Sequence, residues 1–416
     1  MIFTMKSFIF IVYFSTFSIF SYTQEVFVGQ INKPLQPWEK GYLDIHAINT
    51  ARGECTFFIL PDGTTMLVDA GETISQSPNL VPQKPNEKVT PGETYIKYIR
   101  HFMKAVNSNE IDYLLLSHFH IDHMGEVYTD CKWAENNAYQ LTGVTAVGDK
   151  ISFKKVIDRG WPNYNYPIPP VSSAFPNYLN FIKWHQSHNN MLIESFKVGA
   201  NNQVVLLKDT ISYPTFEIRN IAANGHVWTG VENIERNYFI PTNYLDKKEY
   251  PNENMCSIAF RLSYGKFDYF SGGDLPAVTD YEWQNLERPI GFATGPIEAC
   301  KSNHHMNYDS MGLPLLRALR PQVVVIHNCK AQQPDIHVLR RILSSKSYPG
   351  KKSIFSTNLH EATPYVVYPN TQKMSATQGH IVIRVQPGGN VFFVYVLDDT
   401  SDNYNVLSIH GPYKCN

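Results

Sequence analysis

Three histidines and an aspartate crowd into one short stretch of the chain, which reads HFHIDH. The stretch follows the apolar run YLLL, which is typical of a buried β-strand. Since alternate residues of a strand project to the same face, we expect His118 and His120 to point together where the backbone leaves the sheet. A turn would then place Asp122 and His123 on the other side of the same point. Two adjacent sets of nitrogen and oxygen donors like these suit two borderline-soft divalent ions such as zinc.

The alternative interpretation is a polar loop that happens to contain histidines. Imidazoles packed this densely repel one another when protonated, whereas a bound cation favours their neutral, ligating form. His and Asp clustered at ligand spacing therefore favour a metal site over a plain loop. The chain also offers no Gly-x-Ser-x-Gly nucleophile motif that would compete with metal chemistry.

The HFHIDH motif resembles the His-x-His-x-Asp-His signature of the metallo-β-lactamase superfamily, and other segments resemble that family in the same order. Strand-like segments at 56–60 and 66–71 flank a Pro-Asp-Gly turn. A second strand pair ends in SGGD, whose Asp274 matches the family's metal-bridging aspartate, and KSNHH ends at His305, which matches a late histidine ligand. The resemblance implies an α/β fold of the αββα type, in which two mixed sheets face each other with helices outside and metals at one edge.

The same resemblance implies which residues hold two metal ions. His118 and His120 would hold the first ion. The second ion would be held by Asp122, His123 and His305, and Asp274 would bridge the two ions. Asp69 would accept a hydrogen bond from a ligand imidazole, as metal-binding histidines require. The first ion is one ligand short, and His226 is the candidate for that position, because His185 and His188 read as surface residues.

Two such ions, zinc or alternatively manganese, lower the pKa of a shared water and make hydroxide available near neutral pH. Asp122 and Asp274 are therefore predicted to be catalytic through the ions they hold. Within the superfamily, residues 252–257, the double histidine and the tail at 377–385 resemble the branch of the ComEC hydrolase domain and phosphorylcholine esterase. That branch favours a phosphodiester substrate. A lactam, lactone or thioester hydrolase and an inactive binding protein remain alternatives.

The N-terminal segment predicts export. Residues 1–21 combine Lys6, an apolar centre and small residues near the end, which is typical of a signal peptide and too short for a confident membrane anchor. We therefore expect a secreted or periplasmic protein without stable membrane insertion after cleavage. The formal net charge of −1 gives no global basic field, so a small-molecule or cell-envelope ester is a better partner than nucleic acid.

Residues 22–416 show no linker that would divide them, so we expect one elaborated domain with a strand-rich C-terminal extension. The segment at about 127–215 is an irregular, proline-containing insertion, and we expect it either to wall the substrate pocket or simply to cover the core. The six scattered cysteines could pair in an oxidising compartment or lie buried as free thiols.

Overall fold

The computed structural model describes residues 28–75 and 77–416, so the predicted signal peptide at 1–21 lies outside it. Within the described residues the strands form two mixed sheets. The first has nine strands in this order: β17 (Val406–Lys414), β16 (Val391–Leu397), β15 (His380–Val385), β1 (Leu43–Ala47), β2 (Thr56–Ile59), β3 (Thr65–Val68), β4 (Ile111–Leu115), β5 (Phe153–Asp158) and β6 (Leu192–Ser195).

The second sheet has eight strands in the part of the chain that is described: β14 (Ser353–Ser356), β13 (Val323–Ile326), β12 (Ala299–Lys301), β11 (Phe267–Ser271), β10 (Ala259–Tyr264), β7 (Glu217–Ala223), β8 (His226–Trp228) and β9 (Glu235–Asn237). Each sheet pairs an antiparallel half with a parallel half, as β2–β3 and β3–β4 illustrate in the first. In the first sheet the parallel strand β4 leads into the loop that carries His118, His120 and His123. In the second sheet the parallel strands β11 and β12 lead into the loops that carry Asp274 and His305.

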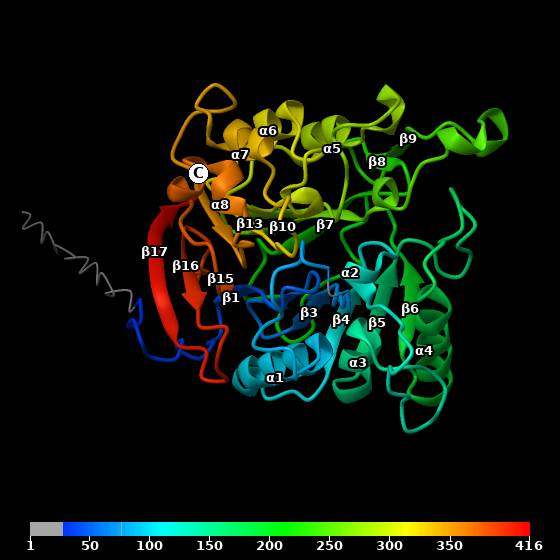
Figure 1. Ribbon diagram of the computed structural model, residues 1–416, viewed down its shortest axis with the longest axis horizontal. Coiled ribbons are helices and arrows are strands. Elements are labelled where there is room, and N and C mark those ends of the chain that lie inside the picture. Colours follow the sequence, from blue (N-terminus) through cyan, green and yellow to red (C-terminus); the bar gives the residue numbers. More distant parts are fainter. Residues whose placement is uncertain (1–27, 76) are drawn as a thin grey trace, which may run out of the picture.

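Helices cover the outer faces of both sheets (Figure 1). On one side lie α1 (Pro91–Met103), α3 (Gly143–Lys150) and α4 (Phe175–His188); on the other lie α5 (Glu287–Thr294), α6 (Leu313–Leu319) and α7 (Ile336–Leu343), with the short α8 (Thr363–Val367) beside β14–β16. Buried side chains form three clusters, one between the sheets and one under each helical layer. The predicted αββα sandwich is therefore confirmed.

Strand β4 shows how alternation serves these layers. Tyr113 and Leu115 belong to the cluster between the sheets, whereas Leu114 and Leu116 belong to the cluster beneath the helices. This is the two-residue period of a strand that is buried on both faces. The chain then leaves the sheet at Ser117, directly before the histidines.

Helix α1 supports the first sheet next to this exit. Thr90 and Glu93 form a capping box, and Pro91 occupies the first turn, where its missing N–H is not needed. The buried face of the helix includes Tyr95, whose hydroxyl donates to the backbone oxygen of Gly71 at 2.8 Å. Helix α1 thereby fixes the turn that follows β3.

The three C-terminal strands complete the first sheet. β15 pairs antiparallel with β1, and β16 and β17 continue outward from it. All six cysteines are buried and free. Among the described residues we find no helix with the length and apolar character needed to cross a bilayer.

Candidate metal centre

The HFHIDH stretch bends into the space between the two sheets. His118 and His123 are fully buried, and a one-turn helix, α2 (Ile121–Met124), begins directly after His120. The rings of His118 and His120 meet at 4.8 Å, with Nε2 of the first 3.1 Å from Nδ1 of the second. The short helix carries Asp122 and His123 back toward them, so the motif folds into a single cluster of donors.

The other half of the cluster comes from the second sheet. Asp274 follows β11 in a turn where Gly273 has a φ of +52°. His305 lies in a 3-10 turn whose three residues His304, His305 and Met306 all have positive φ, from 42° to 59°. Such angles are unfavourable for residues with a side chain, and strained runs of this kind concentrate at functional sites.

Three separations between donor atoms in this cluster are close to those of a metal shell. Asp274 Oδ2 lies 3.2 Å from His123 Nε2 and 3.3 Å from His305 Nε2, and Asp122 Oδ2 lies 3.2 Å from His305 Nε2. Four donors placed tetrahedrally at ~2.0–2.1 Å from an ion are separated by roughly 3.3 Å. These three separations are compatible with a shared ion.

A second group of donors shares Asp274 with the first. Nε2 of His118 is 4.0 Å from Asp274 Oδ2 and 3.1 Å from Nδ1 of His120. Asp274 thus faces both groups, which is the geometry that a bridging carboxylate needs. The chain supplies only three donors to this second group, which leaves coordination positions open, as catalytic sites do.

The hydrogen bonds of the rings orient their free nitrogens toward the cluster. His123 Nδ1 lies 2.8 Å from Asp69 Oδ2, and His305 Nδ1 lies 2.9 Å from the backbone oxygen of His327. By contrast, Nε2 of His123, Nε2 of His305 and Oδ1 of Asp274 are buried without a hydrogen-bond partner. Buried polar atoms left in this way call for a ligand that is not a protein group, and a cation beside Asp274 Oδ2 would satisfy the two ring nitrogens.

The charges around the rings also favour a cation. Burial acts to lower the pKa of His123 and His305, but Asp274 and Glu54 outweigh burial and hold both pKa values well above the usual one. Burial and the neighbouring His123 hold the pKa of His118 well below its usual value. Protons on two rings therefore balance the carboxylates of the metal-free protein, and a divalent cation would replace those protons.

Two residues at this site were not anticipated from the sequence. Glu54, in the loop between β1 and β2, and Lys301, at the end of β12, form an ion pair whose side chains are only 3% exposed. Burial raises the pKa of Glu54, but Lys301 and the nearby histidines lower it to about 2. The donor atoms of Glu54, His123, Asp274 and His305 all lie within 4.8 Å of one another. The only sequence signal for this pair is a charged residue beside or at the end of each of two buried strands.

A second buried ion pair holds the ligand loop from behind. Glu253 Oε1 accepts the backbone N–H of Phe119 at 2.9 Å, between the first two histidines. Arg159 donates to both oxygens of the same carboxylate, at 2.8 and 2.7 Å, and its side chain is fully buried. The bidentate pair fixes the position of the ligand loop relative to the sheet.

The donor cluster opens into a polar cavity of about 550 Å³. Its lining includes six residues from the second sheet's loops beyond the ligands themselves: Asn254, His304, Asn307, Tyr308, Lys330 and Gln332. No residue between 127 and 215 lines it within the described parts of the chain, which favours the alternative that this insertion covers the core. The insertion instead packs through α4 against the first sheet, where Phe181 and Ile182 are fully buried.

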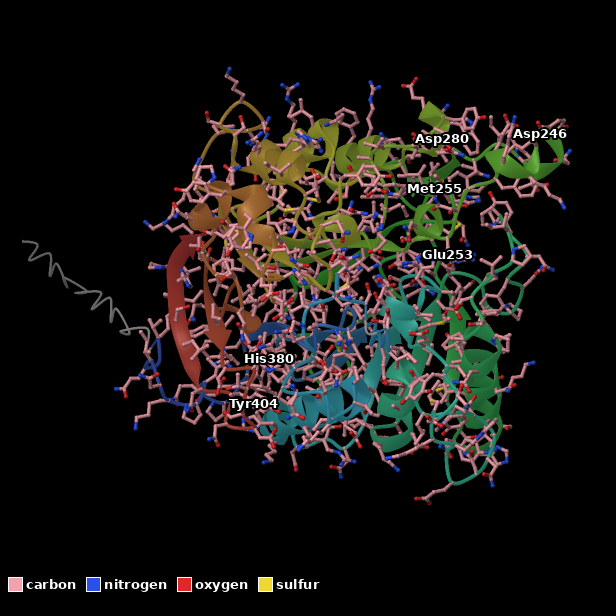
Figure 2. The ribbon with its side chains drawn as sticks, in the orientation of Figure 1. Asp246, Glu253, Met255, Asp280, His380 and Tyr404 are labelled. Atoms are coloured by element: carbon pink, nitrogen blue, oxygen red, sulfur yellow. The ribbon has the colours of Figure 1, made fainter. Side chains whose placement is uncertain are left out.

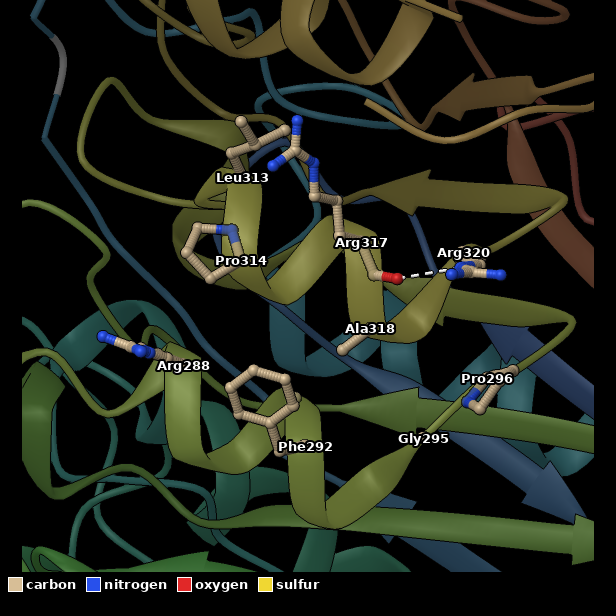
Figure 3. A pocket seen from close by; sticks show the side chains of 10 residues that line it. Arg288, Phe292, Gly295, Pro296, Leu313, Pro314, Arg317, Ala318 and Arg320 are labelled. Carbon is tan, nitrogen blue, oxygen red and sulfur yellow. Dashed lines mark hydrogen bonds between the residues drawn. The ribbon is translucent and has the colours of Figure 1, made fainter. Parts of the chain in front are cut away.

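A larger hollow, of about 670 Å³, lies between α5 and α6 (Figure 3). Its floor is apolar, with Phe292 70% exposed, and three arginines surround it. It contains no histidine or carboxylate side chain, so it offers no metal chemistry. The candidate site is therefore the smaller, polar cavity.

His226 lies apart from the cluster. It begins β8, its Nδ1 is 2.8 Å from Oε1 of Glu235 on the edge strand β9, and it lines a different cavity with Phe196 and Asn224. His188 is exposed, as expected, but His185 is buried against Tyr139, with Nε2 2.8 Å from the hydroxyl. The expectation that His185 is a surface residue is wrong, because its ring completes the packing under α4.

His304 has a role that its neighbour His305 does not share. Its Nδ1 lies 2.7 Å from Asp309 Oδ1, and its Nε2 faces the cavity, 3.3 Å from the amide of Asn254. An imidazole oriented by a carboxylate is the usual arrangement of a general acid or base.

No protein-family model and no curated protein matches this sequence. Among solved structures, the short form of human tRNase Z (ELAC1) is similar with a TM-score of 0.32 and 7% sequence identity, over 68% of this chain and 91% of that one. A likeness of that degree is too weak to support an inference. The fold is therefore assigned from the sheet order and the layers, and the site from its own donor atoms.

Proposed function

We propose that this chain is a dinuclear-metal hydrolase that acts on phosphodiesters. The observation that supports it most is the shared position of Asp274, whose Oδ2 faces donors on both sides while buried nitrogens of His123 and His305 lack hydrogen-bond partners. A cluster of this kind is costly to fold without a ligand, because each unpaired polar atom loses its hydration.

The proposed ligands divide as the donor distances suggest. His118 and His120 hold one position, Asp122, His123 and His305 hold the other, and Asp274 serves both. Two divalent ions held there, zinc or manganese, would supply hydroxide at neutral pH and positive charge facing the ester. Asp69 fixes the tautomer of His123, because its carboxylate accepts from Nδ1 and leaves Nε2 free to bind.

The leaving group needs a proton, and His304 is placed to give it. Asp309 holds the Nδ1 side of the ring, so a proton on Nε2 points into the cavity beside the donor cluster. Asn254 Nδ2 lies 3.3 Å from the same Nε2 as a donor, so the Asn254 amide must turn its oxygen to this nitrogen or move away when Nε2 carries the proton. Donation of this proton to a departing alkoxide is ordinary general-acid catalysis.

The polarity of the cavity favours phosphorus over an acyl carbon. Beyond the proposed ligands, its walls present amides, an ammonium at Lys330, a phenol at Tyr308 and a carboxylate at Asp335, and no Ala, Val, Leu or Ile among the described residues. Pockets for apolar ligands are lined mainly by hydrophobic side chains. An anionic ester with polar substituents fits these walls better than a lactam or a lactone does.

A substrate panel tests the proposal. Protein dialysed and reloaded with zinc or manganese should bind two ions per chain and hydrolyse bis-p-nitrophenyl phosphate or p-nitrophenyl phosphorylcholine, and chelation should abolish turnover. Nitrocefin serves as the acyl control. Turnover of nitrocefin alone would favour the lactam alternative. Less than one ion per chain with no ester turnover would favour the inactive binding protein.

We also propose that the protein is exported, on the support of the predicted signal peptide at 1–21. The N-terminal residue of the mature protein, determined after expression with an export machinery, tests this. Cleavage near residue 21 is expected, and an intact N-terminus on protein that stays inside the cell would contradict it.

A further inference from the structure

The buried ion pair of Glu54 and Lys301 lies directly behind the proposed ligands. Lys301 Nζ donates to both carboxylate oxygens of Glu54, at 2.8 and 2.7 Å, and to the backbone oxygen of Gly273 at 2.7 Å. An ammonium has three N–H donors, so all of them are used. The pair is thus fully hydrogen-bonded and excluded from water.

Glu54 meets the ligand rings from the side opposite to Asp274. Its Oε1 lies 3.1 Å from Nδ1 of His305, and its Oε2 lies 3.8 Å from Nδ1 of His123. The Nε2 atoms of both rings face Asp274 instead. A carboxylate in this position contacts the ligands without itself reaching the space that their free nitrogens surround.

Lys301 supports the aspartate that both donor groups share. Its bond to the Gly273 oxygen fixes the turn that carries Asp274, in which Gly273 has a φ of +52°. The same ammonium lies 3.6 Å from Asp274 Oδ1. A positive charge in that place repels bound cations, so its presence requires a compensating negative charge nearby.

We infer that Lys301 is a positioning residue for the Asp274 turn, and that Glu54 balances its charge rather than ligating an ion. The inference rests on the proposed metal site. The rival assignment makes Glu54 a ligand, which the 4.8 Å spacing of the donor atoms of Glu54, His123, Asp274 and His305 permits. Against that assignment, both oxygens of Glu54 accept from Lys301, and Glu54 faces the Nδ1 atoms of His305 and His123 rather than the Nε2 atoms that face Asp274.

A double-mutant cycle on zinc affinity separates the two assignments. The proteins compared are the wild type, Glu54→Gln, Lys301→Met and the double variant, each dialysed and titrated with zinc against a chromophoric chelator. Glu54→Gln leaves the ammonium unbalanced, so its zinc affinity should fall by about 10–100-fold, the usual range for a residue that supports a ligand. In the double variant, Lys301→Met removes the repelling charge, so its zinc affinity should be at least about tenfold higher than that of Glu54→Gln.

The single variant Lys301→Met gives a second, independent result. Removing the ammonium removes a charge that repels the ions but also releases the Asp274 turn, so zinc affinity should stay within about tenfold of the wild type. Its kcat should fall with KM little changed, because the Asp274 turn is no longer anchored. A loss of zinc affinity by Lys301→Met well beyond about tenfold would contradict charge balance even where Glu54→Gln does not fold.

The control is the other buried pair that bridges two strands, Asp44 and Arg384, whose bidentate bonds measure 2.8 and 2.6 Å. The variant Asp44→Asn/Arg384→Met should lose stability and keep its zinc affinity. A double Glu54→Gln/Lys301→Met variant that binds zinc no better than Glu54→Gln would overturn the inference and leave the metal site standing. Wild-type protein that binds no zinc would refute the proposed function as well.

Discussion

Asp274 is the carboxylate that faces both groups of donor atoms in the site. It is 2% exposed, and its Oδ2 lies within 4.0 Å of three imidazole nitrogens. Burial acts to raise the pKa of Asp274, but His123 and His305 hold it well below its usual value. A charged aspartate is therefore available at neutral pH, and under the proposed function its charge would hold two cations close together.

Asp274→Asn keeps the shape of this side chain and removes its charge. We expect the metal content to fall from two ions toward one and the rate to drop by at least about 10²–10³-fold, the scale of losing one preorganised electrostatic group. Metal analysis after exhaustive dialysis and steady-state kinetics measure both. Two tightly held ions and full activity in this variant would refute the bridging role.

His226→Ala is the matched control for that experiment. The ring is paired with Glu235 on an edge strand and lines a separate cavity. Metal content and rate should both stay at the wild-type level. Loss of one ion would show instead that His226 reaches the cluster in the loaded protein.

The pair of His304 and Asp309 predicts a dependence on the leaving group. His304→Gln should slow esters with alkyl alkoxide leaving groups by about 10²–10³-fold, because those groups need a proton. Esters that release p-nitrophenolate should be affected by less than about tenfold, since that anion leaves without protonation. Asp309→Asn should show the same pattern more weakly. Equal losses on both substrate classes would exclude a proton-donor role.

Local spacing predicted four residues of this site, and the family resemblance added Asp274, His305 and Asp69. His118, His120, Asp122 and His123 are neighbours along the chain, so their proximity follows from the backbone alone. Glu54 and Lys301 are 247 positions apart, and only the packing of the two sheets brings them together. A lone acid and a lone lysine beside buried strands have no pattern that separates them from ordinary charged residues.

At the level of elements, the turn after β3 and the short helix α2 share one narrow space. A Cβ added to Gly71 would lie 1.8 Å from the backbone oxygen of Asp122 and 2.1 Å from its carbonyl carbon. Backbone atoms cannot move aside as a flexible side chain can. The close approach of these two segments therefore fixes the positions of Asp122 and His123 relative to the other proposed ligands.

Gly71→Ala should therefore displace α2 and lower zinc affinity by at least about tenfold, the scale of disturbing a ligand's support. Gly230→Ala is the control, because that glycine has a φ of +86° but nothing within 4 Å of its added Cβ. The control should cost about 1 kcal/mol of stability through backbone strain and leave zinc binding unchanged. Equal zinc affinities in both variants would contradict the steric argument.

Elements were predictable where apolar runs and turn residues agree. The strand at 323–326 and the hairpin that precedes SGGD appear as β13 and as β10–β11, with Gly265 in the connecting turn. The irregular segment at 127–215 was harder, because its proline-containing stretch gives no period. Its helix α4 covers the core, and the cavity is walled instead by loops of the second sheet.

For the whole molecule, buried neutral histidines set a limit at acid pH. His380 accepts the N–H of Asn49 through Nδ1 at 2.9 Å, and burial lowers the pKa of His380 to about 3. It lies beside Tyr404 in the first sheet (Figure 2). As the pH falls below about 6.5, the unfolded chain binds a proton at this residue before the folded protein does, so stability falls.

His380→Gln should remove this contribution. Between pH 7 and pH 4.5 the wild type should lose on the order of 2 kcal/mol more unfolding free energy than the variant does. Glu72 and Glu287, whose pKa values burial raises to about 7, act in the opposite sense, but they are common to both proteins and cancel in the difference. Urea unfolding of both proteins at the two pH values measures it. A variant with the same acid sensitivity as the wild type would contradict the assignment.

The pairing of β1 with β15 also has a consequence in time. All the proposed ligands have been synthesised once the growing chain reaches residue 305, whereas the partner strand of β1 begins only at His380. Until then a strand whose five residues are all buried in the finished protein offers an open edge. An open edge recruits strands from other chains. Interrupted synthesis should therefore yield chains that already carry every ligand yet aggregate through their first strand.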